Sequence, residues 1–185
     1  MSKTFLVLCH PLETSLNSAV FQMLRGELEK SGKAVAYSDL YRDNYFPGMM
    51  DQKYYEGEVQ KIQESDMVIL QFPMYFSGFP AVLQDWIIEV LLKNPQVIEG
   101  KKVLLSITAG GSQSDYSCTG DRGSLDKILS PLLDFVFKDS FLLQPFIIFS
   151  CNGSNREGIS KKISFLQGEV PNFSNWPVKH TLIEA

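Results

Sequence analysis

The chain has 185 residues, of which 44% are hydrophobic and 21% charged, which is typical of one globular domain with a sizeable core. The formal net charge of −4 gives no basic face for nucleic acid, and no apolar run approaches the roughly 20 residues that span a bilayer. The three cysteines, Cys9, Cys118 and Cys151, are far apart and form no metal or disulfide pattern. We therefore expect a single domain, residues 1–185, in a reducing cytoplasmic setting.

Five short apolar runs are typical of buried β-strands, and they lie at residues 5–9, 34–37, 67–72, 103–108 and 146–150. Apolar residues at helical spacing predict helices at about 15–28, 81–93, 125–137 and 156–167. Strands that alternate with helices predict an α/β fold with a parallel sheet. Residues 42–55 are rich in Pro, Gly and aromatic side chains, so we expect an irregular excursion there before the next helix.

The first strand runs into a polar loop and a helix that begins near Ser15. The unpaired N–H groups and positive dipole end of a helix N-terminus bind phosphate. Hydroxyl and amide side chains near this start belong to Thr14, Ser15, Asn17 and Ser18. His10 could donate to the same anion, although capping of the helix is the simpler alternative. The absence of a Rossmann glycine fingerprint and of a P-loop disfavours nucleotide sites of those two kinds.

The third strand runs into residues 71–80, which contain two prolines, a glycine and several aromatic side chains. Open α/β sheets bind ligands at the carboxyl ends of their strands, and a stiff aromatic loop there suits a flat aromatic ligand. Flavin is the leading candidate. The alternative is a turn in which Tyr75, Phe76 and Phe79 only cover the edge of the sheet.

The fourth strand ends in paired glycines, Gly110 and Gly111, followed by Tyr116. Paired glycines permit close approach of the backbone to a ligand, and the tyrosine could donate a hydrogen bond to a ring carbonyl. A flexible loop with a surface tyrosine is the alternative. Three successive strands thus end in loops suited to a phosphate, a ring face and a ring edge, and their coincidence is stronger evidence than any one of them.

These motifs together resemble the NAD(P)H:quinone oxidoreductase family. The resemblance runs in order along the chain, through His10 with residues 14–17, residues 39–41, 65–68 and 71–73, residues 78–83 with Trp86, and residues 108–112 with Tyr116. The family contains DT-diaphorase, bacterial modulator-of-drug-activity proteins, general stress protein 14 and the ancillary subunit of potassium efflux systems. Each motif alone is weak, but the ordered set is specific.

The resemblance implies a flavodoxin-like three-layer fold whose five-stranded parallel sheet has the order 2-1-3-4-5. It also implies a tightly bound flavin that carries two electrons from NAD(P)H to a quinone in a ping-pong scheme. The chain stops at Ala185, without the C-terminal extension of the longer family members, which favours FMN over FAD. No metal is implied.

Roles for individual residues follow from the same resemblance. The flavin phosphate and ribityl chain would be held by His10, Thr14, Ser15, Leu16 and Asn17. The isoalloxazine would lie against Pro73, Met74, Tyr75 and Phe76. Its pyrimidine edge would contact Thr108, Ala109, Gly110, Gly111 and Tyr116.

The chain departs from DT-diaphorase at Arg122, where that protein carries a histidine six residues after the tyrosine. A Tyr–His proton relay therefore cannot be assumed. A permanently charged guanidinium could instead stabilise the anionic reduced flavin or bind a cofactor phosphate. The simpler alternative is a salt bridge to Asp121 or Asp115.

Two other functions stay open on the sequence alone: a flavoprotein that regulates a membrane transporter or channel, and a low-potential electron carrier. The first would place the protein at the inner face of the membrane. Family members usually complete their site across a two-fold interface, and Phe76, Phe79 and the residues 41–55 add apolar surface. We therefore expect a homodimer, and no nucleic-acid partner.

Overall fold

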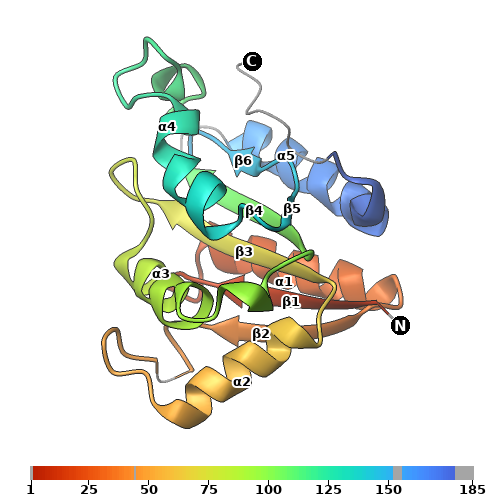
Figure 1. The fold of residues 1–185 in the computed structure, drawn as a ribbon. Coiled ribbons are helices and arrows are strands. Elements are labelled where there is room, and N and C mark those ends of the chain that lie inside the picture. Colours follow the sequence, from red (N-terminus) through yellow and green to blue (C-terminus); the bar gives the residue numbers. More distant parts are fainter. Residues whose placement is uncertain (1, 44, 152–155, 178–185) are drawn as a thin grey trace.

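The computed structural model describes residues 2–43, 45–151 and 156–177. A central sheet is covered by helices on both faces (Figure 1). Its strands are β1 (Lys3–Leu8), β2 (Ala34–Asp39), β3 (Met67–Met74), β4 (Lys102–Ala109), β5 (Phe141–Leu142) and β6 (Phe146–Ile148). All of these strands pair in parallel, in the order β2-β1-β3-β4, with β5 and β6 both on the outer side of β4. The predicted flavodoxin-like fold is confirmed.

The fifth predicted strand differs, because two short strands take its place. β5 pairs with the start of β4, and β6 pairs with residues 106–108 near its end. Pro145 lies between the two and has no N–H to donate to a ladder, which explains the break. β6 ends at Ile148, two residues before the predicted end, and Ser150 has a left-handed φ of 59°.

The helices follow the predicted alternation. They are α1 (Leu16–Lys30), α2 (Gln52–Gln63), α3 (Ala81–Trp86), α4 (Leu125–Ser130) and α5 (Arg156–Glu169). α3 and α4 each continue as a wider π-helical segment, Ile87–Leu92 and Pro131–Val136. The irregular excursion ends at Asp51, four residues earlier than predicted, because its carboxylate accepts from the Tyr54 N–H at 2.8 Å and so caps α2.

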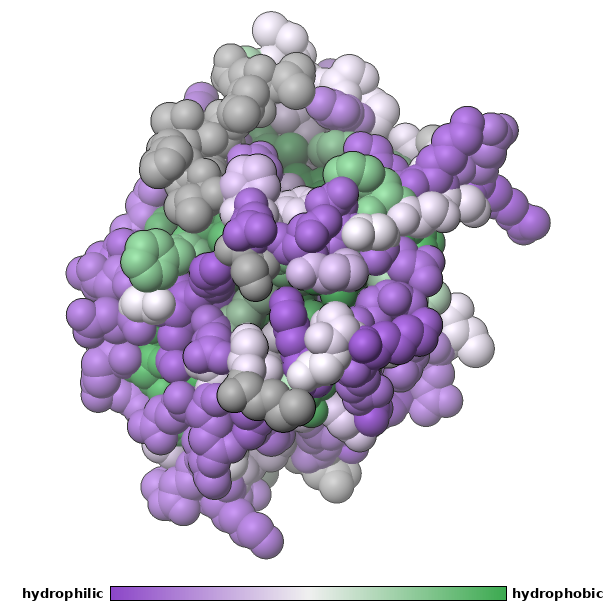
Figure 2. All heavy atoms as spheres, turned by 90° about the vertical axis from the view of Figure 1, so that its right-hand side faces the viewer, coloured by the Kyte–Doolittle hydropathy of each residue, from purple (hydrophilic) through white to green (hydrophobic). Residues whose placement is uncertain are grey.

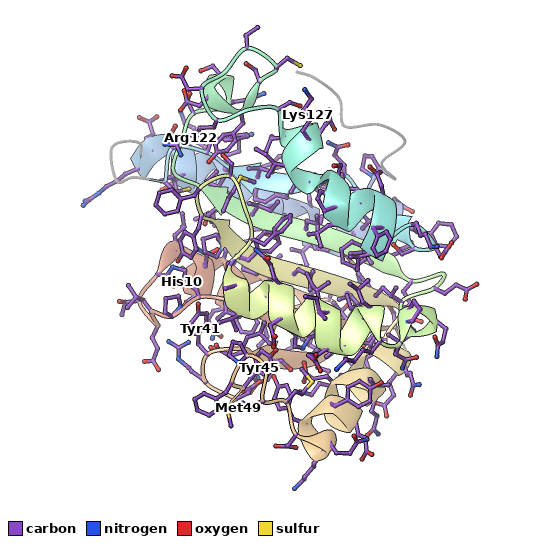
Figure 3. The ribbon with its side chains drawn as sticks, turned by 60° about the vertical axis from the view of Figure 1, so that its left-hand side comes forward. His10, Tyr41, Tyr45, Met49, Arg122 and Lys127 are labelled. Atoms are coloured by element: carbon purple, nitrogen blue, oxygen red, sulfur yellow. The ribbon has the colours of Figure 1, made fainter. Side chains whose placement is uncertain are left out.

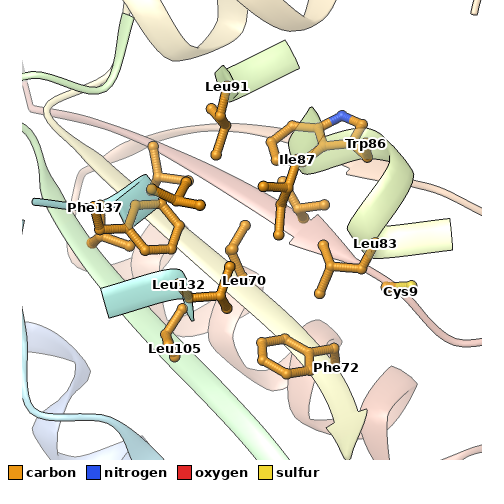
Figure 4. Packing of buried hydrophobic residues seen from close by; sticks show 14 of the residues in the cluster. Cys9, Leu70, Phe72, Leu83, Trp86, Ile87, Leu91, Leu105, Leu132 and Phe137 are labelled. Carbon is orange, nitrogen blue, oxygen red and sulfur yellow. The ribbon is translucent and has the colours of Figure 1, made fainter. Parts of the chain in front are cut away.

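The core forms on both faces of the sheet. Every residue of β3 is buried, and alternate side chains of that strand point to opposite faces. Leu70 and Phe72 pack with Trp86 beneath α2, α3 and α4 (Figure 4). Met67 and Ile69 pack on the other face with residues of α1 and α5. The sheet is therefore rigid at its centre, which leaves the loops at its ends as the places for binding.

The two ends of the sheet differ. Figure 2 shows the end at which the strands begin, where hydrophilic side chains cover most of the surface around smaller hydrophobic areas. Figure 3 brings the opposite, carboxyl end forward, and His10 and Arg122 both lie there. Among the described residues, no helix is long and apolar enough to cross a membrane.

Candidate functional site

Three loops meet at the carboxyl end of the sheet, after β1, β3 and β4. These strands are direct neighbours, so their ends lie side by side. The chain passes from β1 to β2 on one side and returns to β3 on the other, which makes the β1–β3 boundary the topological switch point. Ligands of open α/β sheets bind at such points.

The loop after β1 is built as a helix start with exposed donors. Ser15 is the N-cap of α1, and its hydroxyl accepts from the Ser18 N–H at 3.1 Å. The Ser18 hydroxyl donates to the Leu12 carbonyl at 2.9 Å, which fixes the loop. The backbone N–H groups of Leu16 and Asn17 lie in the first helical turn, where a helix supplies no partner. Thr14 is exposed beside them.

His10 is oriented by its own loop. His10 Nδ1 lies 3.1 Å from the Leu12 nitrogen and 3.2 Å from the Leu12 carbonyl oxygen, so the loop contacts the Nδ1 side of the ring. A role for His10 toward an anion stays a prediction. Arg42 braces this loop, because its guanidinium pairs with Glu13 at 2.9 Å and with Asp39 at 2.7 Å. No local pattern predicts this role of Arg42, because its partner Glu13 lies 29 residues away.

A buried polar network, which we call the Asn17 network, joins the three strand ends. Asn17 Nδ2 donates to Thr108 Oγ1 at 2.9 Å, and Gln71 Nε2 donates to Asn17 Oδ1 at 2.8 Å. All three residues are at most 5% exposed. The Asn17 side chain therefore faces the sheet, and only its backbone N–H is placed toward the helix end. Gln71 Oε1 has no hydrogen-bond partner among the residues that the structure describes.

The loop after β3 is a tight and strained turn. Tyr75 and Gly78 exchange two backbone hydrogen bonds, at 3.0 and 2.8 Å. The two residues between them are left-handed, with φ of 47° at Phe76 and 56° at Ser77. Non-glycine residues rarely adopt this conformation, and such strain concentrates at binding sites. The Phe76 ring is fully exposed and Tyr75 is partly exposed, whereas Pro73 and Met74 are buried within β3.

The loop after β4 places two glycines differently. Thr108 and Ala109 are buried at the end of the strand. Gly110 is exposed, and a Cβ added there would meet no atom within 4 Å. Gly111 is buried, and a Cβ there would lie 2.6 Å from Arg122 Nε. One glycine therefore faces open space, and the other lies against a cation.

Tyr116 is buried, so the alternative of a surface tyrosine on a flexible loop is wrong. It is 4% exposed, and its ring centroid lies 5.8 Å from that of Phe149. The Arg122 guanidinium carbon lies 5.7 Å from the Tyr116 ring centroid. Arg122 pairs with Asp115 at 4.0 Å. Hydrogen bonds from the Ser112 N–H and hydroxyl, and then the charge of Arg122, hold the pKa of Asp115 below its ordinary value.

A cavity of about 550 Å³ lies beside this loop, toward the outer edge of β6. Tyr116, Phe149, Phe165 and Trp176 are among the residues that line it. It shares the segment 113–119 with the candidate site but includes no residue of the loops after β1 and β3. The cavity is therefore a separate feature from the candidate site at the three strand ends.

The structure thus gathers the residues that the sequence singled out at one edge of the sheet, with different exposures. The turn at Tyr75 and Phe76 is exposed, as is Gly110, and His10 is half-buried. The side chains of Asn17 and Thr108 are buried and form the support beneath them. The sequence named Gln71 and Ser77 only as members of the loop 71–80 and assigned them no role of their own, whereas Asp115 was offered as a salt-bridge partner of Arg122, and the structure shows that pair. Gln71 stands beside the quoted proline motif, and its buried position on β3 was the available signal.

Comparisons with known proteins agree with this geometry. Residues 2–162 match the profile of a family described by its flavodoxin-like fold. The chain is 32% identical to NAD(P)H dehydrogenase (quinone) 1 of Rattus norvegicus over 190 residues, which cover 80% of this chain and 69% of that protein. An NAD(P)H:quinone oxidoreductase from Methanothermobacter marburgensis superposes with a TM-score of 0.75, 18% identity and full coverage of both chains.

A second solved structure, general stress protein 14 of Treponema denticola in complex with FMN, superposes with a TM-score of 0.70 at 20% identity. The match covers 92% of this chain and 98% of that one. At these identities the two structures establish the shared fold, while the sequence matches establish kinship.

Proposed function

The chain belongs to the flavodoxin-like family of NAD(P)H:quinone oxidoreductases, and from that premise we propose that it is an NAD(P)H dehydrogenase that reduces quinones through bound FMN. The observation that carries the proposal is the meeting of three complementary loops at the switch point of the sheet. Each loop offers the chemistry that one part of a flavin mononucleotide requires.

The residues present fit that cofactor. The phosphate would bind the first turn of α1, where the helix leaves the backbone N–H groups of Leu16 and Asn17 unpaired and where His10 lies in the preceding loop. The ring face would lie against the exposed turn of Tyr75 and Phe76. The pyrimidine edge would approach Gly110, beside which the backbone leaves open space.

A flavin bound here would supply the redox chemistry, namely ping-pong transfer of two electrons from NAD(P)H to a quinone-type acceptor. The protein positions the reactants and stabilises charge. Arg122 places a permanent cation beside Gly111, next to the backbone proposed for the ring edge. Charge that develops at that edge during reduction is stabilised more than the uncharged ground state.

We also propose that the protein works as a homodimer. Large apolar side chains are exposed at this same edge, among them Phe46, Met49, Tyr75 and Phe76. Figure 3 shows Met49 and Tyr41 on the loop beside the His10 region. A second copy would cover such a surface and enclose the nicotinamide and quinone. Light scattering should give about twice the 20.9 kDa chain mass, whereas a monomer at micromolar concentration would remove the dimer from the proposal.

Flavin identity is the first test. Purified protein should carry FMN, or should take it up with quenching of flavin fluorescence and bind riboflavin more weakly, because riboflavin lacks the phosphate. Anaerobic addition of NADH or NADPH should bleach the flavin, and a quinone should restore its colour. Protein that binds neither FMN nor FAD would overturn the proposal. Equal affinities for FMN and riboflavin would remove only the phosphate assignment.

A further inference from the structure

The Arg122 side chain is 45% exposed, yet it lies directly against Gly111. A Cβ added to Gly111 would lie 2.6 Å from Arg122 Nε and 2.9 Å from Arg122 Cδ. The start of the guanidinium therefore occupies the space that a side chain at Gly111 would need. Every residue other than glycine at that position would push Arg122 outward.

The main chain of Arg122 is fixed as well. Its N–H donates to the Asp115 carbonyl at 2.9 Å, and its carbonyl accepts from the Ser77 hydroxyl at 3.0 Å. Ser77 belongs to the strained turn after β3, so Arg122 links two of the three loops of the candidate site. A Cβ at Gly120 would lie 2.3 Å from the Asp115 carbonyl, so the chain at Gly120 lies close against it.

Asp115 is the acidic group at this arginine. One carboxylate oxygen accepts from the Ser112 N–H at 2.7 Å and lies 4.0 Å from Arg122 Nε. The same oxygen would lie 2.8 Å from a Cβ on Gly111. Carboxylate, guanidinium and glycine therefore meet at one point. Asp121, the adjacent acidic residue, forms no ion pair within 4 Å in the part of the chain that the structure describes.

We infer that Asp115 is a positioning residue, which clamps the Arg122 guanidinium against Gly111 so that a fixed positive charge faces the pyrimidine edge of the bound flavin. The inference rests on the proposed function. It adds that a carboxylate holds the permanent charge in place, and that the glycine is required for the charge to lie there.

Sulfite is a suitable probe, because its affinity is an equilibrium property that does not depend on turnover. The sulfur lone pair of sulfite forms a bond to the flavin ring and leaves a negative charge at the pyrimidine edge, which bleaches the flavin absorbance. A cation at that edge strengthens sulfite binding. Arg122→Gln should weaken it about tenfold, as expected for a unit charge at contact distance with partial solvent screening.

Asp115→Asn separates positioning from simple electrostatics, because the two predict opposite signs. Loss of a negative charge near the flavin, with Arg122 unmoved, would tighten sulfite binding. Release of the guanidinium from its clamp should instead weaken sulfite binding several-fold. Asp115→Glu should restore most of the affinity. Asp121→Asn removes the same charge one residue from Arg122 and is the matched control, for which we expect no weakening.

Gly111→Ala tests the clamp without changing any charge. The backbone at Gly111 is not left-handed, and the atoms that the methyl group meets belong to side chains, so the variant should fold and displace Arg122. Sulfite binding should weaken toward the level of Arg122→Gln, and the double variant should be no weaker than Arg122→Gln alone. FMN titration of each apoprotein shows separately whether the flavin still binds.

The outcomes distinguish the two proposals. Wild-type protein that binds no flavin overturns the proposed function itself. Flavin-loaded Asp115→Asn protein whose sulfite affinity is unchanged or higher overturns the positioning role and leaves the proposed function standing. Weaker sulfite binding in Asp115→Asn and Gly111→Ala, with Asp121→Asn unaffected, supports the clamp.

Discussion

Two buried polar networks lie on different parts of the sheet, and they differ in charge and completeness. The first, which we call the Glu58 network, centres on a carboxylate that is 1% exposed. Glu58 accepts from Ser38 and Lys61, both at 2.7 Å, and from Trp86 Nε1 at 2.8 Å. The Asn17 network is uncharged, and within the described part of the chain it leaves Gln71 Oε1 without a hydrogen-bond partner.

This difference indicates that the Glu58 network stabilises the fold, whereas the Asn17 network supports the candidate site. A buried charge with complete partners fixes the elements that carry them, and the Glu58 network joins α2 to β2 and to the end of α3. The Asn17 network lies beneath the three loops of the candidate site, and it joins the first turn of α1 to β3 and to the end of β4. We therefore expect changes in the Glu58 network to affect stability alone, and changes in the Asn17 network to affect stability less and flavin binding more.

Glu58→Ala should have the largest effect. It leaves the Lys61 ammonium, the Ser38 hydroxyl and the Trp86 indole N–H without their common acceptor, and breaking such a pair typically costs about 3 kcal/mol or more. Urea unfolding of the apoprotein measures the loss. Glu56→Ala, an exposed change on the same helix, should lie within about 0.5 kcal/mol of wild type. A loss for Glu58→Ala no greater than that of the control would contradict the comparison.

High pH should lower the stability of the core on the face of the sheet that carries the Glu58 network. Burial raises the pKa of Cys9 to about 12 from 9.0, and burial followed by the Glu58 carboxylate raises the pKa of Tyr54 above its ordinary value. The folded state then keeps protons that the unfolded chain releases, so stability falls as pH rises above about 9. Cys9 alone accounts for roughly 3 kcal/mol by two pH units above its ordinary value.

The check is urea unfolding of wild type and Cys9→Ala between pH 7 and 11. The slope of unfolding free energy against pH should be shallower in the variant, whatever its stability at pH 7. Parallel slopes would show that Cys9 does not contribute. The candidate site responds in the opposite direction, because the lowered pKa of Asp115 gives a contribution that is present above pH 3.8 and is lost as pH falls.

Asn17→Ala should lower stability less than Glu58→Ala does and should weaken flavin binding more. It leaves the Gln71 amide and the Thr108 hydroxyl without their common partner, which costs roughly 1–2 kcal/mol for uncharged groups. The loops that the network supports also lose their common anchor. We expect FMN affinity to fall about tenfold, with riboflavin affected to a smaller degree. A stability loss with unchanged flavin affinity would show that the Asn17 network is only structural.

The sequence predicts the sheet because β1, β3 and β4 are buried on both faces, which makes them continuous apolar runs. The broken fifth strand escaped prediction because β5 and β6 are two and three residues long, below the length at which a pattern can form. The helix start at Ser15 was predicted from its hydroxyl and confirmed as an N-cap.

The site was predicted in outline but not in its internal contacts. The sequence marked Asn17 as a phosphate ligand, whereas its side chain bonds Gln71 and Thr108, which lie 54 and 91 residues away. The left-handed turn at Phe76 and Ser77 has no glycine at either position, so no turn signal marked it. Both features arise from tertiary contacts that no local pattern contains.

Gly110→Ala tests whether the ligand uses the open side of the β4 loop. A Cβ there meets no protein atom within 4 Å, so the stability of the apoprotein should stay within about 0.5 kcal/mol of wild type. A flavin edge that approaches the glycine closely would collide with the methyl group, and FMN and riboflavin should both bind about fivefold more weakly. Unchanged binding of both would place the ring edge elsewhere.

Tyr116→Phe should have the smallest effect. The ring is buried against Phe149 and beneath the Arg122 guanidinium, and phenylalanine preserves both contacts. Only the hydroxyl is lost, so stability and FMN affinity should hardly change.

If the hydroxyl donates to a ring carbonyl as charge develops there, anaerobic stopped-flow reduction by NADH should slow about two- to threefold. This effect is smaller than that of Arg122→Gln, because a neutral donor stabilises charge less than a cation does. Tyr116→Leu, which keeps an apolar side chain but removes the ring, should slow reduction further by freeing the guanidinium. Equal rates for Tyr116→Phe and wild type would reduce Tyr116 to a packing residue and leave Arg122 as the group that stabilises charge at this edge.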